Sequence, residues 1–282
     1  MATEAATGQT VSRPGIVSLG SVVRVAETIV GAVLLILILQ WVLEFEIADP
    51  RLWSIYWRPF TDGIVGSLGY IALILPVSVL MGFFLGWARI SRFRVLAWPV
   101  ATYVDFFRGV PPLVIVIFAS LIGPSLMPER FQSRTLGLTL AALALAFHSA
   151  AYQAEIFRAG FQSVHRGQLE AAQALGLKPL QAMRHVVLPQ AFRLSLPPLG
   201  NELAVLIKDT SLLSAIGAID IFGLSQDVQQ QLIFTPGSDL RWLFIIWTAV
   251  ALVYFVMTYA MTTILAYLER RVRVRGLETM SI

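Results

Sequence analysis

Cysteine is absent from this chain of 282 residues, and charged residues are scarce. Without cysteine, the chain can form no disulfide, no thiolate nucleophile and no metal site with cysteine ligands. The only histidines are His148, His165 and His185, and no two of them have the spacing of a metal-ligand motif. These absences exclude thiol chemistry and the common zinc sites.

Only 13% of the residues are charged, whereas a soluble domain of this length would carry roughly 25%. Hydrophobic residues make up 57%, and the mean hydropathy is +0.74. Residues 64–88, 135–154 and 242–268 each contain no charge. Each stretch is long enough to cross a hydrocarbon core about 30 Å thick. The chain is therefore expected to be an all-α integral membrane protein.

The hydropathy pattern predicts six membrane helices. They are residues 24–45, 64–88, 109–127, 135–157, 191–207 and 242–268. The polar segment 1–23 lacks a basic region followed at once by an apolar run and a cleavage site, so we expect a flexible tail instead of a signal peptide. Pro76 is expected to kink the second span.

The basic residues of the loops between these spans predict the orientation. One side carries Arg89, Arg92, Arg94, Arg158, Arg166, Lys178, Arg184, Arg193, Arg270, Arg271, Arg273 and Arg275. The other side carries half as many: Arg51, Arg58, Arg130, Arg134, Lys208 and Arg241. The first side should be cytoplasmic, which places both termini inside the cell. The net charge of +4 is thus explained by membrane topology and does not indicate nucleic acid.

The loop between the fourth and fifth spans is long, and its sequence predicts two short helices at roughly a right angle. Its first half is rich in Ala, Leu, Gln and Glu, which are strong helix formers. Gly176 is placed as the residue after a helix end, and Pro179 fits the first turn of a second helix. Pro189 is expected to close that helix.

The same loop resembles the EAA motif of ABC-importer permeases. That motif has Glu-Ala-Ala, three residues, Gly, nine residues, an aliphatic residue, one more, and then Leu-Pro. This chain matches every spacing with Glu170, Ala171, Ala172, Gly176, Val186, Leu188 and Pro189. In that family the first helix is the coupling helix, which docks in a cleft on the ATPase. The alternative from the residues alone is an amphipathic helix lying on lipid headgroups, because basic residues flank it.

The resemblance extends over residues 64–271 and narrows to the polar amino-acid permeases, of the histidine, glutamine, glutamate and arginine type. Residues 105–111, 149–160, 196–201 and 206–212 resemble signatures of that family in the same order, although Val110 stands where Thr is usual. The resemblance implies a type I ABC-importer permease fold with five core helices plus one extra N-terminal helix. It divides the chain into a tail (1–23), the extra helix and outer loop (24–60), the permease domain (61–271, coupling loop 158–190) and a C-terminal tail (272–282).

The function implied by this resemblance is uptake of polar or charged amino acids across the bacterial inner membrane. The chain would be a permease subunit and no enzyme, with no cofactor of its own, because ATP and Mg would be bound by the partner ATPase. Two ATPase subunits, a second identical or homologous permease, and a periplasmic or tethered binding protein are the implied partners. Neither Lys178 nor Lys208 completes a P-loop, so the energy must come from outside the chain.

The fifth span holds the best candidates for the substrate pathway. Pro197, Pro198 and Gly200 should unwind the helix part-way across, where only protein or a water-filled cavity can satisfy the freed backbone groups. Asn201 and Glu202 follow at once, and an ionisable residue at that depth indicates a functional site. A carboxylate facing a cavity suits an ammonium or guanidinium group. Alternatively, Glu202 pairs with an arginine or a backbone donor at a subunit interface.

Several other polar residues have mainly structural interpretations. Arg108, followed by Gly, Val and two Pro, indicates a stop and restart between an interfacial helix and the third span, with pore coupling as the alternative. Glu155 and Arg158 are three residues apart on a helix and can form an ion pair, with a gate as the alternative. Lys208, Asp209, Thr210 and Ser211 are expected to cap and anchor the outer end of the fifth span, with contact to a docked binding protein as the alternative. His148 is expected to be packed and hydrogen-bonded, and residues 218–238 to form an outer lid or docking surface.

Two other classes of protein compete with the importer. A secondary transporter for small polar solutes would usually show internal repeats and paired intramembrane carboxylates, whereas no convincing repeat is found here and Glu202 stands alone. A membrane-embedded enzyme would need a reactive cluster, and the sequence shows no Ser, His and Asp set at reactive spacing.

Overall fold

The computed structural model describes residues 46–133 and 135–272, together with 27, 30–31, 33–34, 36–38 and 40–42. The chain divides into two compact units, Met1–Asp49 and Pro50–Ile282. In the first unit the described positions from 27 to 42 are helical, as the first predicted span requires. Residues 46–49 of that unit are described as well, whereas the predicted tails 1–23 and 272–282 lie outside the described part, except for residue 272 itself.

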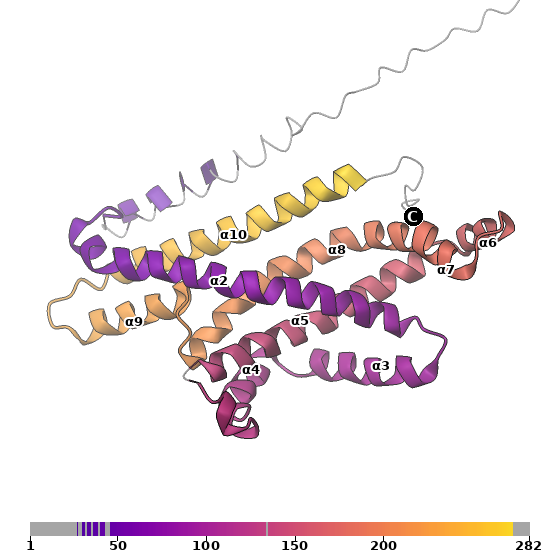
Figure 1. The fold of residues 1–282 in the computed structure, drawn as a ribbon. Helices are drawn as coiled ribbons and strands as arrows, with labels where there is room; N and C mark the ends of the chain where they lie inside the picture. Colours follow the sequence, from indigo (N-terminus) through magenta and orange to yellow (C-terminus); the bar gives the residue numbers. More distant parts are fainter. Residues whose placement is uncertain are drawn as a thin grey trace, which may run out of the picture. The chain divides into compact units, whose positions relative to one another are not determined.

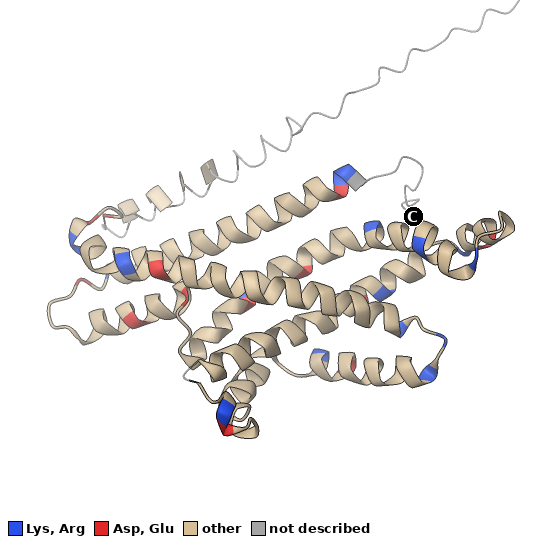
Figure 2. Ribbon diagram, viewed as in Figure 1, with Lys and Arg blue, Asp and Glu red and all other residues tan. Residues whose placement is uncertain are grey.

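Within the described residues of the second unit, every regular element is a helix (Figure 1). Three of these helices are long and apolar enough to cross a membrane: α2 (Pro50–Arg89), α5 (Leu136–Ser163) and α10 (Trp242–Val272). They contain the second, fourth and sixth predicted spans. Helix α2 starts inside the segment predicted as an outer loop and continues through Pro59 and Pro76. In the ribbon of Figure 2, the colours of charged residues are absent from α10 until its C-terminal end.

The third predicted span, residues 109–127, contains a shorter helix than expected, α4 (Pro112–Leu121). Helix α3 (Arg94–Gly109) precedes it, and the two helices are bent by 102°. Two adjacent prolines cause the break, because neither can donate a backbone hydrogen bond and each disfavours helix in the residue before it. The predicted stop and restart after Arg108 is therefore confirmed. Two 3₁₀ turns follow, η1 (Pro124–Leu126) and η2 (Glu129–Phe131).

The fifth predicted span lies in α8 (Leu188–Asp209), which remains helical through Pro197 and Pro198. The prediction that this helix unwinds is wrong. Helix α8 packs against both α5 and α10, and Leu196, Leu199 and Gly200 are buried there. This packing holds the helix together although the prolines remove two internal hydrogen bonds. Because α8 also carries charges, it is not among the helices apolar enough to span by composition, and the number of six spans stays a prediction.

Short helices connect the long ones at both ends of the bundle. After α5 come α6 (Arg166–Ala174), α7 (Pro179–Ala182) and the π-helix η3 (Met183–Val187), which runs directly into α8. After α8 come η4 (Thr210–Ile216) and α9 (Ile221–Phe234), which occupies most of the predicted outer segment 218–238. Figure 1 places α6 and α7 at the opposite end of the bundle from α9.

Helix α5 lies at the centre of the bundle, where small residues permit close packing. Its alanines at 141, 142, 146, 150, 151 and 154 are fully buried. On α2, Gly82 and Gly86 face α5 so closely that a Cβ on either would lie within 2.7 Å of an α5 atom. Small residues four apart let helix backbones approach in this way in membranes. Helices α2 and α5 are therefore locked together over about one turn.

Candidate functional site

The loop predicted to couple to an ATPase forms an elbow of short helices, residues 166–187. Helix α6 ends in a Schellman motif, in which Leu177 N–H donates to the carbonyl of Ala172 (3.1 Å) and Gly176 N–H donates to the carbonyl of Gln173 (2.9 Å). Gly176 has φ +85°, a backbone conformation that glycine adopts without strain. The predicted role of Gly176 as the residue after the helix end is confirmed.

The second arm of the elbow starts where predicted but does not end there. Pro179 is the first residue of α7, and Lys178 N–H donates to Gln181 Oε1 at 2.9 Å, which fixes the turn. Pro189 does not close a helix. It lies in the first turn of α8, directly after the π-helix, where the missing N–H of proline costs little. The elbow is thus continuous with α8, and a displacement of one can move the other.

The outer surface of the elbow is open. Glu170 and Ala171 are exposed, while Ala172 is only 4% exposed and packs inward. Leu175 and Leu180, on either side of Gly176, are 82% and 72% exposed. Two exposed leucines beside small alanines form an apolar surface of the kind that another protein covers. Leu188 and Pro189 are partly buried at the base of the elbow.

Glu202 belongs to a chain of buried polar groups that crosses three helices. Ser149 Oγ donates to Glu202 Oε1 at 2.9 Å, and Gln153 Nε2 donates to the hydroxyl oxygens of Ser149 and Ser78, each at 3.0 Å. Gln153 is fully buried, and its Oε1 has no hydrogen-bond partner in the described part of the chain. Within the residues that the structure describes, Glu202 has no basic partner.

The other predicted pathway residues lie around Glu202 on α8 but differ in exposure. Asn201 and Pro198 are exposed, whereas Gly200 is buried. Ser149, Gln153 and Ser78 were not predicted from the sequence to belong to this site. Gln153 could have been found, because a glutamine among alanines inside an apolar span must find buried partners.

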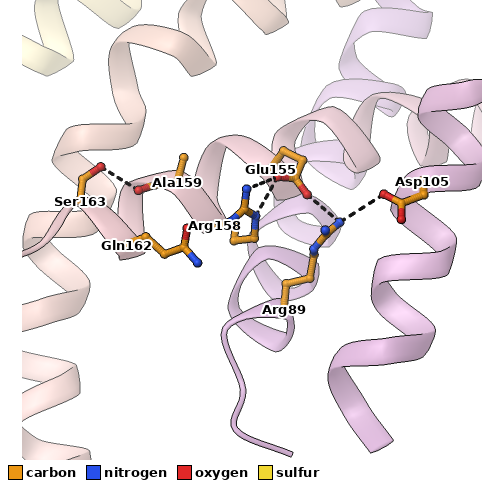
Figure 3. Close-up of polar contacts among 7 residues, drawn as sticks. All are labelled: Arg89, Asp105, Glu155, Arg158, Ala159, Gln162 and Ser163. Carbon is orange, nitrogen blue, oxygen red and sulfur yellow. Dashed lines mark hydrogen bonds and ion pairs between the residues drawn. The ribbon is translucent and has the colours of Figure 1, made fainter. Parts of the chain in front are cut away.

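Four charged side chains meet where α2, α3 and α5 come together (Figure 3). Glu155 lies 2.7 Å from Arg158, so the predicted ion pair is confirmed, and it lies 2.6 Å from Arg89 as well. Asp105 of α3 is 3.8 Å from Arg89. Arg158 also donates to Gln162 Oε1 at 2.6 Å. The partners Arg89 and Asp105 were not predicted, because they are distant in sequence.

Two further predicted residues have structural contacts. The guanidinium of Arg108 lies 5.4 Å from the ring centroid of Tyr152, whose hydroxyl donates to the Arg108 carbonyl at 3.4 Å. His148 is buried and packs against Tyr152 as predicted, and it has a backbone hydrogen-bond partner in Phe107, although its Nδ1 has no partner among the described residues. The contacts of Arg108 tie the end of α3 to α5.

The predicted cap at the outer end of α8 is confirmed for Thr210 and Ser211 and is wrong for Asp209. Asp209 makes no side-chain cap hydrogen bond, and Lys208 is exposed. Instead α8 continues into η4, and the hydroxyls of Thr210 and Ser211 donate to the carbonyls of Ile207 and Lys208, each at 2.7 Å. Of the four residues predicted to cap the helix, the two with hydroxyl groups thus satisfy carbonyls at its end.

No group of three or more histidine, aspartate or glutamate side chains that could hold a metal occurs among the described residues. The polar chemistry of this part of the molecule consists of the elbow, the Glu202 chain and the four-charge cluster. None of these supplies a nucleophile paired with a base.

Comparisons with known proteins give a consistent result. Residues 78–274 match the family model described as "Binding-protein-dependent transport system inner membrane component". The chain is 34% identical over 214 residues to the probable glutamine ABC transporter permease protein GlnM of Bacillus subtilis (strain 168), covering 75% of this chain and 92% of that protein. It is 32% identical over 213 residues to the glutamate/aspartate import permease protein GltK of Escherichia coli O157:H7, covering 74% and 92%.

Solved structures agree. A chain of the "Crystal structure of an amino acid ABC transporter with histidines" matches with a TM-score of 0.63 and 34% identity, covering 77% of this chain and 95% of that one. A chain of the MetNI methionine ABC transporter in an inward-facing conformation matches with a TM-score of 0.53 at 19% identity, which supports the fold alone.

Proposed function

This chain belongs to the family of binding-protein-dependent transport system inner membrane components, and from that premise we propose that it imports polar or charged amino acids. It is a permease subunit of an ABC importer, and the elbow at residues 166–187 is the observation on which the mechanism rests. Relatives named for glutamine and for glutamate/aspartate support this substrate class. The importer family disfavours the alternative of a secondary transporter.

The elbow receives the force of ATP hydrolysis in this proposal. Helix α6, with Glu170, Ala171 and Ala172, docks on an ATPase subunit, and its C-terminal Schellman turn at Gly176 fixes the angle to α7. Because the second arm continues into α8, a push on α6 displaces the helix that carries Glu202. The exposed Leu175 and Leu180 give this contact an apolar component.

A crosslinking experiment tests the docking. The chain has no cysteine, so Ala171→Cys introduces a unique thiol, and Gln230→Cys, exposed on α9, is the matched control. A thiol-reactive photocrosslinker at residue 171 should capture the ATPase, whereas the one at residue 230 should not. Capture of lipid alone at residue 171 would instead support the amphipathic helix on headgroups and overturn the proposal.

Glu202 recognises the cationic group of the substrate in this proposal. The support is its position beside a buried polar chain and its lack of a basic partner in the described part of the molecule. A carboxylate that receives only a hydroxyl hydrogen bond from its own chain retains capacity for an ammonium or guanidinium group. Asn201, Pro198 and Gly200 would shape the surrounding path.

Substitution of Glu202 tests this role. Glu202→Gln keeps the shape and removes the charge, so uptake of a cationic substrate should fall at least tenfold, as expected for a lost charge-assisted contact of about 1.5–3 kcal/mol. Unchanged uptake and unchanged selectivity would remove Glu202 from the site. Co-purification of the variant with the ATPase would show that it still folds and assembles, so that a loss of uptake can be assigned to the lost charge.

The assembly and orientation complete the proposal. One chain forms half of the pathway, so a second permease, two ATPase subunits and a periplasmic or tethered binding protein are required. The side with Arg89, Arg158 and the elbow faces the cytoplasm in the inner membrane, as the distribution of basic residues favours. Figure 2 shows Lys and Arg residues at the α2–α3 connection and at the start of α8, on that same end of the bundle.

A further inference from the structure

A cavity of about 550 Å³ opens where α2, α3 and α5 meet, at the end of the bundle that carries the elbow. Its polar lining comes from all three helices: Arg89 of α2, Arg94 of α3, and Arg158 and Gln162 of α5. Among the described residues that line the cavity, three are arginines and none is acidic. Such a lining selects an anion.

Two of these arginines are held in place by a carboxylate that does not line the cavity. Glu155 contacts Arg89 at 2.6 Å and Arg158 at 2.7 Å, but Glu155 itself does not line the cavity. Even with Asp105 counted, the three guanidinium groups face only two carboxylates, which leaves one positive charge in excess. Side chains held in this way lose little conformational entropy when a ligand binds.

Arg94 supplies the unpaired charge. It is exposed at the start of α3, and in the described part of the chain it has no acidic partner. A guanidinium group presents its donors in a planar fork that matches the oxygen atoms of a phosphate. An anion in the cavity would therefore complete the hydrogen bonding of Arg94 without breaking the pairs that Glu155 makes.

The surroundings indicate an anion that arrives with an apolar tail. Trp98, which also lines the cavity, is 72% exposed, and Val95 and Phe93 nearby are 90% and 61% exposed. Tryptophan is enriched at the level of lipid headgroups, where its ring is apolar and its N–H meets polar groups. This part of α3 thus offers lipid contact directly beside a basic cavity.

We propose that this cavity binds the phosphodiester headgroup of an anionic phospholipid, with Arg94, Arg89 and Arg158 around the phosphate and Trp98 beside the glycerol and upper acyl chain. The leaflet is the one on the side of the elbow, which is the cytoplasmic leaflet in the orientation given above. Basic pockets between membrane helices on the cytoplasmic side recognise anionic lipids by this chemistry. A bound lipid would brace the α2–α3 corner against α5.

The test uses the intact permease–ATPase complex and a matched pair of variants. Arg94→Gln removes a charge from the cavity, whereas Arg92→Gln removes the same charge two residues away, where the side chain packs on Phe93 and does not line the cavity. Retention of phosphatidylglycerol is measured by native mass spectrometry after reconstitution in mixed phosphatidylcholine and phosphatidylglycerol nanodiscs. Arg94→Gln should weaken retention about five- to tenfold, as expected for one charge-assisted contact, and Arg92→Gln should leave it near the parent value.

Three outcomes would overturn the proposal. Equal losses in the two variants would show attraction to the general surface charge only. Full displacement of the lipid by inorganic phosphate would show a site for a free anion. Retention of phosphatidylglycerol that appears only when the ATPase is removed would show that a carboxylate of the partner normally fills the cavity. Recovery of retention by Arg94→Lys, which restores the charge, would support the proposal.

Discussion

Glu155 of α5 lies 2.6 Å from Arg89 at the end of α2, although the two residues are far apart in sequence. The same carboxylate lies 2.7 Å from Arg158, so one acidic group serves two guanidinium groups (Figure 3). The side chains of Glu155 and Arg89 are 17% and 19% exposed. This contact fastens α2 to the central helix at the end where the elbow begins.

Loss of the Glu155 carboxylate should destabilise the complex. Glu155→Gln leaves the largely buried Arg158 without its carboxylate and leaves Arg89 with only the exposed Asp105, and we expect a cost of about 1–3 kcal/mol after allowance for solvent screening. The midpoint of thermal unfolding of the detergent-purified complex should fall by several degrees.

Asp105→Asn is the control for this substitution. Its carboxylate is 3.8 Å from Arg89 and its side chain is 70% exposed, so removing the charge should change stability by less than about 0.5 kcal/mol. A larger effect for Asp105→Asn than for Glu155→Gln would contradict the view that Glu155 is the centre of the cluster.

Gly86 should be intolerant of any side chain. A Cβ there would lie 2.7 Å from the carbonyl oxygen of Ala154 and from Cβ of Phe157, so Gly86→Ala must push α2 away from α5. Overpacking of this kind costs about 1–3 kcal/mol. Gly69→Ala on the same helix meets nothing within 4 Å and should be neutral or stabilising, because alanine favours helix. Thermal unfolding of both variants checks the difference, and equal behaviour would contradict the close packing.

Gly176→Ala should impair coupling more than it impairs folding. Its φ of +85° strains any residue with a Cβ by about 1 kcal/mol, and relief of that strain would change the angle between α6 and α7. Gly237→Ala carries the same strain, at φ +82°, in the loop before α10. Substrate-stimulated ATPase activity in proteoliposomes should fall several-fold for Gly176→Ala and stay near the parent value for Gly237→Ala. Equal losses would show that strain, and not the elbow, is responsible.

The local features of the elbow could be predicted from the sequence, because they depend on neighbouring residues. Gly176 and Pro179 occupy positions where glycine and proline have a conformational advantage, and the structure places them there. The three apolar helices could be predicted for a similar reason, since length and composition alone decide whether a segment can cross a bilayer. The family resemblance added the function, which no local feature specifies.

The predictions that were wrong or incomplete concern residues whose conformation or partners depend on tertiary contacts. Pro197 and Pro198 were predicted to unwind the helix, but the packing of α8 between α5 and α10 keeps it intact. Pro189 was predicted to end a helix, and it lies instead in the first turn of α8. Arg158 lies on the same helix as Glu155, so the spacing of the two residues was enough to predict their ion pair. Arg89, the other partner of Glu155, and Ser149, the partner of Glu202, come from other helices and could not be found in this way. Sequence patterns of this kind locate a polar residue well and its long-range partner poorly.

The polar chain beside Glu202 yields a prediction with an internal control. Ser149 and Ser78 each accept a hydrogen bond from Gln153 Nε2 at 3.0 Å, but only Ser149 also donates to Glu202. Ser149→Ala and Ser78→Ala therefore each remove one hydroxyl group that accepts a hydrogen bond from Gln153. Both substitutions should lower the free energy of unfolding by a similar amount, about 1 kcal/mol.

The two variants should differ in transport. Without the Ser149 hydroxyl, Glu202 loses its hydrogen-bond donor from α5, and its carboxylate is no longer held in one position. If that position is the one that meets the substrate's cationic group, the KM for uptake through the binding protein should rise about fivefold in Ser149→Ala, as expected for one weakened contact of about 1 kcal/mol. It should be unchanged in Ser78→Ala. Equal KM values in two variants of equal stability would mean that Glu202 is held for packing alone, because the polar chain would then have no effect beyond the fold.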